Sequence, residues 1–160
     1  MKRASFGMVA AVLAMQCGNA AAVTLDPAAC WDNRTLAAAR VFEFRAIGLN
    51  VQLRCRLIGL DIMPGYAGVL ERYHGDFDAA EGAIKAHYHA DDSRAHWLDY
   101  QRYLTHVTNI YGGGATTAVL CRTFAGVLGE LSSPATPVTA LEAVAVAMVK
   151  DPHIDTAVCQ

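Results

Sequence analysis

Several residue types that mark particular activities are scarce in this chain of 160 residues, and their scarcity narrows its possible functions. Beyond residue 22, serine occurs only at Ser93, Ser132 and Ser133, and none of them lies in the G-x-S-x-G sequence of many hydrolases. Lysine and arginine number 13 against 15 aspartates and glutamates. No nucleic-acid partner is expected, because sequence-independent binding to phosphates needs a basic surplus.

Long apolar runs are also missing, apart from one short run near the start. Lys2 and Arg3 precede an apolar, alanine-rich stretch at residues 4–15, and small residues follow up to Ala22. This is the pattern of a secretory signal peptide, so we expect residues 1–22 to be removed and 23–160 to form a single helical domain. The run is shorter than the roughly 20 residues of a transmembrane helix, and no later stretch is predicted to span a membrane.

A lipid anchor on Cys17 is the alternative for this segment, but Gln16 stands where lipidation requires a small residue. The favoured expectation is therefore an unanchored protein of the periplasm or the exterior of the cell. Loss of Lys2 and Arg3 with the signal peptide would leave a net charge of −4, since this segment contains no acidic residue.

Cysteine motifs for metal or redox chemistry are absent, because no C-x-x-C occurs. An even number of cysteines, four, follows the predicted cleavage site, which in an exported chain indicates two disulfides. Three pairings are possible. We favour Cys55 with Cys121, which lie in two strongly helical stretches, and Cys30 with Cys159, because chain ends often lie close together.

Helical periodicity dominates the rest, and no segment alternates between apolar and polar residues, so the predicted fold is an all-α, compact bundle of about five or six helices tied by two disulfides. The first helix is expected over residues 33–59, with a buried stripe formed by Phe44, Ile47, Val51, Cys55 and Ile58.

Capping signals divide the remaining helices. Pro64 suits a first helical position, and Asp78 with Glu81 resembles a capping box that opens a third helix. Residues 91–93 separate that helix from a fourth, which the glycine triplet at 112–114 ends. A fifth helix is expected over 117–131, and Thr136 with Pro137 resembles a cap that opens the last one.

Charge is unevenly distributed along the chain. Between Arg34 and Arg56 five arginines face one acid, Glu43, whereas residues 61–99 contain eight acids and three basic residues. We therefore expect a basic first helix to lie beside an acidic middle segment.

Histidines concentrate between His74 and His106, which raises a metal-binding alternative. His87 and His89 point in different directions on one helix, but His89, Asp92 and His96 could converge around the turn between two helices. Glu71 and His74 form only one of the two motifs that a di-iron bundle needs. The favoured expectation is that the protein binds no metal and no cofactor.

The fourth helix carries polar residues within an apolar pattern. Thr105 and Asn109 are four residues apart and share a face, and Tyr100 and Tyr103 begin the same segment. The structural interpretation is that Thr105 bonds to a helix carbonyl, and that Asn109 caps the helix or bridges it, with a tyrosine, to the helix of Cys55. The alternative is that this face binds a partner.

These residues also carry a resemblance. The sequence Tyr100-x-x-Tyr103-x-Thr105-x-x-x-Asn109, followed by Cys121, resembles a group of uncharacterised small exported proteins of alphaproteobacteria. Leu53-x-Cys55 and Tyr66 match two further features of that group, although Val69 stands where its second aromatic residue would be. The resemblance runs from residue 40 to 125 and implies a helical, exported, disulfide-tied fold without pointing to an activity.

Together these observations favour a non-catalytic interaction or accessory module, with no catalytic residues and with a protein of the cell envelope as its partner. The alternative is a small metal-binding helical protein that uses His89, His96 and nearby carboxylates.

Overall fold

A computed structural model describes residues 30–159, and the predicted signal peptide with its cleavage site lies outside them. The described residues form no strand and only one isolated bridge, between Trp31 and Val158. None of their helices is long and apolar enough to cross a membrane. The expected all-α fold is confirmed, with helices α1 (Asn33–Leu57), α2 (Met63–Arg72), α3 (His74–His87), α4 (Arg94–Gly112), α5 (Ala118–Ser132) and α6 (Ala140–Met148).

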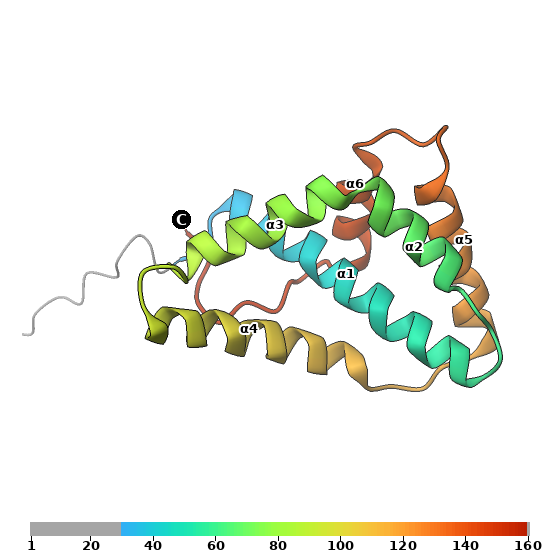
Figure 1. Ribbon diagram of the computed structural model, residues 1–160, viewed down its shortest axis with the longest axis horizontal. Helices are drawn as coiled ribbons and strands as arrows, with labels where there is room; N and C mark the ends of the chain where they lie inside the picture. Colours follow the sequence, from blue (N-terminus) through green and yellow to red (C-terminus); the bar gives the residue numbers. More distant parts are fainter. Residues whose placement is uncertain (1–29, 160) are drawn as a thin grey trace, which may run out of the picture.

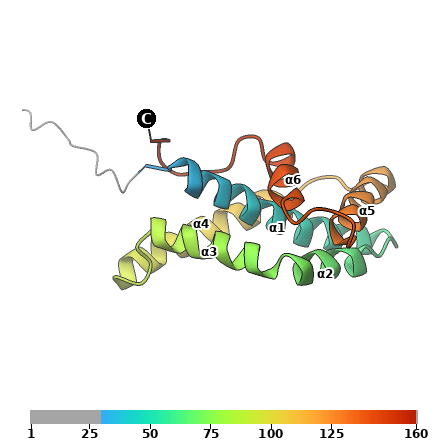
Figure 2. The same ribbon diagram turned by 90° about the horizontal axis from the view of Figure 1, so that it is seen from above.

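The longest helix, α1, runs through the middle of the molecule (Figure 1). It packs against α3, α4 and α6, while α2 packs against α5. In the view from above, α6 and α3 lie on opposite sides of α1 (Figure 2). Each surrounding helix therefore buries one face against α1 or against a neighbour of α1, which is the arrangement that amphipathic helices require.

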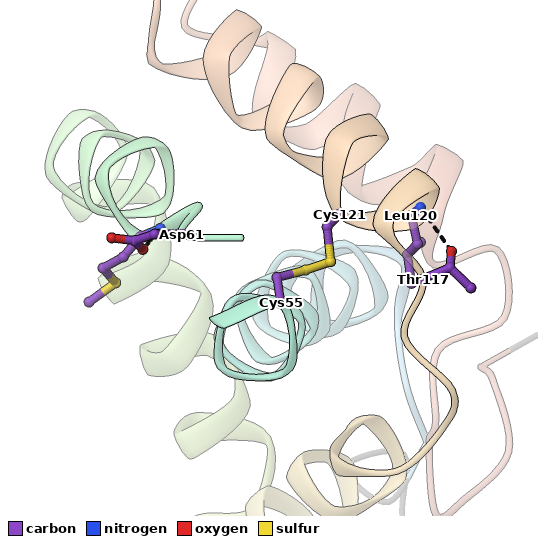
Figure 3. The surroundings of a disulfide bond; sticks show 6 residues. Cys55, Asp61, Thr117, Leu120 and Cys121 are labelled. Carbon is purple, nitrogen blue, oxygen red and sulfur yellow. Dashed lines mark hydrogen bonds between the residues drawn. A yellow bond between two sulfur atoms is a disulfide. The ribbon is translucent and has the colours of Figure 1, made fainter. Parts of the chain in front are cut away.

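Side-chain caps fix the starts of three helices. Asp32 accepts a hydrogen bond from the Thr35 backbone N–H at 2.7 Å and starts α1. Ser93 accepts one from the His96 N–H at 3.2 Å, and Thr117 accepts one from the Leu120 N–H at 3.1 Å (Figure 3). Each cap supplies a partner to an N–H group that has none within its own helix.

The expected capping box at Asp78 is wrong, because α3 already begins at His74. The Tyr73 N–H donates to the Val69 carbonyl at the end of α2, and the Tyr73 carbonyl accepts from the Phe77 N–H at the start of α3. One residue thus serves both helix ends, and Asp78 lies within α3, 3.2 Å from the Nδ1 atom of His74.

The expected cap at Thr136 and Pro137 is also wrong, because α6 begins at Ala140. The Thr136 hydroxyl instead donates to the Glu130 carbonyl near the end of α5, at 2.5 Å. The Pro137 carbonyl accepts from the Ala140 N–H at 3.0 Å, which forms a turn that precedes the helix. Both polar groups are used by the connection, so neither caps α6.

The predicted stripe of α1 is buried up to its last member. Phe44, Val51 and Cys55 are fully or almost fully buried, Ile47 packs partly buried against the core, and Ile58 is exposed. Gly48 lies on the same side. A Cβ atom there would come within 2.5 Å of the Tyr66 ring, so glycine allows α2 to approach α1 closely. The Tyr66 hydroxyl donates to the Arg45 carbonyl at 3.0 Å and fixes that contact.

Both favoured disulfides are present. Cys55–Cys121 joins the last turn of α1 to the first turn of α5 (Figure 3), and Cys30–Cys159 joins the two ends of the described chain. They close long loops, with sequence separations of 66 and 129 residues. A cross-link that closes a long loop lowers the conformational entropy of the unfolded chain. In the chain-entropy account this stabilises the folded protein by about 4 kcal/mol per bond.

Candidate functional site

The segment that follows α6 runs back along the molecule to the start of α1 (Figure 1). The Trp31 N–H donates to the Ala157 carbonyl at 2.9 Å, and the Cys159 N–H donates to the Trp31 carbonyl at 3.0 Å. Together with the Cys30–Cys159 disulfide, these two hydrogen bonds attach the segment to Cys30 and Trp31, just before α1. It thereby brings His153 and Asp155 into contact with helices far away in the sequence.

Glu43 on α1 is completely buried and is the centre of a polar cluster. Its Oε1 atom accepts a hydrogen bond from the His153 backbone N–H at 2.6 Å. Its Oε2 atom accepts one from the Tyr111 hydroxyl at 2.5 Å and lies 2.9 Å from the Nδ1 atom of His153. A buried carboxylate needs such partners, since burial without them costs several kcal/mol.

Asp155 forms a second cluster, with aromatic side chains. One of its oxygens accepts from the Trp31 indole N–H at 3.1 Å and the other accepts from the Tyr88 hydroxyl at 2.8 Å. His87 lies against Trp31, with 4.2 Å between the ring centroids. Burial lowers the pKa of His87 below its ordinary value of 6.5, because the charged imidazolium is poorly solvated there.

Tyr100 and Tyr103 of α4 are both buried, but their hydroxyls differ in their hydrogen bonds. The Tyr100 hydroxyl donates to Glu81 at 3.1 Å, and Glu81 in turn lies 3.5 Å from the Arg45 guanidinium. This is one contact between the basic α1 and the acidic α3. The Tyr103 side chain is only 4% exposed, and its hydroxyl is buried with no hydrogen-bond partner among the described residues.

Thr105 and Asn109 are exposed on the outer face of α4. The expected buried bridge from Asn109 is therefore wrong, because Tyr100, Tyr103 and Val107 are the α4 residues that face the core. The bond back to a helix carbonyl comes from Thr108, which donates to Leu104 at 2.8 Å. The bridge comes from Asn50 on α1, whose amide donates to the Ala46 carbonyl and, at 3.5 Å, to the Thr108 carbonyl.

His89, in the turn before α4, lies near His96, in the first turn of α4. His89 Nδ1 is 3.4 Å from Asp92 Oδ2, and the His89 and His96 rings are 6.1 Å apart. Within residues 30–159, no three histidine, cysteine, aspartate or glutamate side chains are grouped so that they could hold a metal ion.

A row of leucines is exposed on the C-terminal half of α1. Leu49, Leu53 and Leu57 follow one another at intervals of four residues, and their exposed fractions are 41%, 49% and 86%. We call these three side chains the leucine face. Residues four apart lie on the same side of a helix, so the three form one continuous apolar strip.

The sequence reasoning missed both the buried Glu43 and the leucine face. Glu43 was counted as the one acid of a basic helix, but the groups that satisfy it come from the ends of α4 and of the chain. The leucine face does have a sequence signal, the spacing 49, 53 and 57, which runs beside the buried stripe and widens the apolar side of α1.

Comparison with protein-family models, curated proteins and solved structures found no match to this chain. The function is therefore inferred from the contacts and surfaces of the described residues.

Proposed function

We propose that this protein is an exported, non-catalytic interaction module that binds another protein of the cell envelope through the leucine face of α1. The single observation that supports this most is the exposure of Leu49, Leu53 and Leu57 on successive turns of one helix. Contiguous exposed apolar side chains are a feature of protein–protein interaction sites, and helix faces are a common form of such sites.

The leucine face is carried by a firmly held part of the fold. Cys55, between Leu53 and Leu57, is buried and bonded to Cys121 at the start of α5. Gly48, beside Leu49, lies against the Tyr66 ring of α2. A surface that is already ordered loses little conformational entropy on binding, which favours affinity.

Charges beside the leucine face indicate the chemistry of the partner. Arg54 and Arg56 lie on either side of it, and the Arg54 guanidinium donates to the Gly113 carbonyl after α4. Arg56 is exposed. We therefore expect the partner to contribute apolar side chains with acidic residues at their edge, since opposite charges around an interface steer association.

Export is supported by the two disulfides, which form and persist in oxidising compartments, and by the signal-peptide pattern of residues 1–22. Intact-mass measurement of the protein isolated from its host tests it. We expect a mature N-terminus at Val23. Retained residues 1–22, or a lipid on Cys17, would contradict the proposed processing.

Photocrosslinking tests the leucine face. A photoreactive amino acid replaces Leu53 on α1 in one variant. In the control it replaces Glu142, which is also exposed but belongs to α6. We expect irradiation of intact cells to join position 53 to one predominant envelope protein and position 142 to none. Equal adducts at both positions, or no adduct at position 53, would contradict the proposal.

A further inference from the structure

An open pocket of about 310 Å³ lies where α4 meets the end of α3 and the segment after α6, residues 149–159, which we call the C-terminal segment. This volume is at the lower end of the range for small-molecule sites. The pocket is separate from the leucine face and does not depend on the proposed function. Its walls are formed by Tyr88, Asp99, Arg102, Tyr103, His106 and Asp155.

Two aromatic residues, Tyr88 and Tyr103, line the pocket, and Trp31 packs against both of them. The ring centroids of Tyr88 and Tyr103 are 5.5 Å apart, and that of Trp31 lies 5.4 Å from Tyr103 and 6.0 Å from Tyr88. The faces of such rings carry partial negative charge and attract cations.

Of the two carboxylates that line the pocket, that of Asp155 forms no ion pair with a lysine or arginine among the described residues. Arg102 forms an ion pair with Asp99. Asp155 is exposed, and its partners are the neutral Trp31 indole and Tyr88 hydroxyl; among residues 30–159 no lysine or arginine forms an ion pair with it. These two neutral donors hold the carboxylate in a fixed position and leave its charge available to a ligand.

The Tyr103 hydroxyl is the second unused group at this site. It is buried and has no hydrogen-bond partner among the described residues, although a buried polar group of this kind costs about 1–3 kcal/mol. Burial, and then the negative charges of Glu43 and Asp155, raise the pKa of Tyr103, so the hydroxyl keeps its proton and has a free lone pair in a negative surrounding.

We infer that this pocket binds a primary ammonium group on an alkyl chain, with the ammonium donating to Asp155 and to the Tyr103 hydroxyl and the chain lying against the Tyr88 and Tyr103 rings. An ammonium has three N–H donors and one positive charge, which matches a free carboxylate, a free hydroxyl lone pair and aromatic faces. A small free amine and a lysine side chain of a partner protein share this chemistry.

Isothermal titration calorimetry of the mature chain with both disulfides formed tests this inference. The probes are putrescine, Nα-acetyl-lysine-N-methylamide and, as a neutral analogue of putrescine, 1,4-butanediol. The variants are Asp155→Asn, which removes the charge, and Tyr103→Phe, which removes only the hydroxyl. Asp151→Asn is the matched control, since Asp151 is exposed in the same segment and does not line the pocket.

We expect saturable one-site binding of at least one amine, no binding of the diol, affinity about tenfold weaker or worse in both pocket variants, and no change in Asp151→Asn. Stronger binding of putrescine identifies a free amine as the ligand, and stronger binding of the lysine analogue identifies a partner's lysine. Absence of saturable binding up to about 10 mM, or wild-type affinity in Tyr103→Phe or in a folded Asp155→Asn, would overturn the inference. Should Asp155→Asn fail to fold, Tyr103→Phe decides, because its ring is kept.

Discussion

His153 donates its backbone N–H to Glu43 and places its Nδ1 atom 2.9 Å from the same carboxylate, although 110 residues separate the two in the sequence. Because Glu43 is fully buried, this contact anchors the C-terminal segment to the core. The segment also supplies Asp155 to the pocket beside α4.

Glu43→Ala is expected to lower the free energy of unfolding by about 3 kcal/mol, because it leaves the partly buried Tyr111 hydroxyl and His153 N–H without their acceptor. Denaturant unfolding of the disulfide-bonded protein measures it. Glu142→Ala, at an exposed position on α6, is the matched control and is expected to change stability by less than about 0.5 kcal/mol. Equal midpoints for the two variants would show that Glu43 does not hold the segment in place.

Tyr103→Phe is expected to raise the free energy of unfolding of the ligand-free protein by about 1 kcal/mol, because it removes a buried hydroxyl that has no partner. Tyr100→Phe is the matched comparison and is expected to lower it by about 1 kcal/mol, because it removes the hydrogen bond to Glu81. Thermal and denaturant melts measure both. If both variants lost the same stability, the Tyr103 hydroxyl would have a partner.

His87 predicts a pH dependence of stability. Its pKa is lowered from 6.5 in the folded protein, so the unfolded chain binds more protons around and below that pH. The contribution of His87 to the free energy of unfolding is therefore fully present above pH 6.5, and it is lost as the pH falls below that value. His87→Phe keeps a ring against Trp31 and does not titrate. Between about pH 8 and about pH 5, wild-type stability is therefore expected to fall more steeply than that of the variant. Parallel curves would contradict this.

The absence of a tightly bound metal stays a prediction. His89 and Asp92 are close and the His96 ring is near them, but the described residues offer no third grouped ligand. Metal analysis of untagged protein after dialysis against a chelator is expected to find less than about 0.1 equivalent of zinc or copper. One retained equivalent, lost in the variant with both His89→Ala and His96→Ala, would support the metal-binding alternative.

The features that follow from neighbouring residues were predictable from the sequence. The helix starts expected after residues 91–93 and at Thr117 are confirmed, and at each of them a side chain, Ser93 or Thr117, accepts from an N–H three residues further along. Asp78 has the local sequence of a cap as well, but Tyr73 already joins α2 to α3 and leaves no helix start for Asp78 to cap.

Of the features that join distant segments, the two disulfides were predictable because four cysteines allow only three pairings, but the contacts of Asn109 and Glu43 were not. Whether Asn109 faces α1 depends on how α4 is rotated about its own axis. Tyr100 and Tyr103 occupy the buried side of α4, and this rotation leaves Asn109 on the exposed side. Glu43 is buried because groups from α4 and the C-terminal segment reach it. No spacing within α1 encodes those partners.

The proposed function is tested most directly by the sedimentation of the untagged protein isolated from its own cell envelope after mild crosslinking. Leu53→Glu places a charge in the centre of the leucine face. Val146→Glu is the matched control, since Val146 on α6 has a similar exposed fraction, 46% against 49% for Leu53. We predict that wild type and Val146→Glu sediment in a complex with a second protein and that Leu53→Glu sediments as a folded monomer. A monomeric wild type, a complex that contains only copies of this chain, or a complex that Leu53→Glu retains in full would contradict the account.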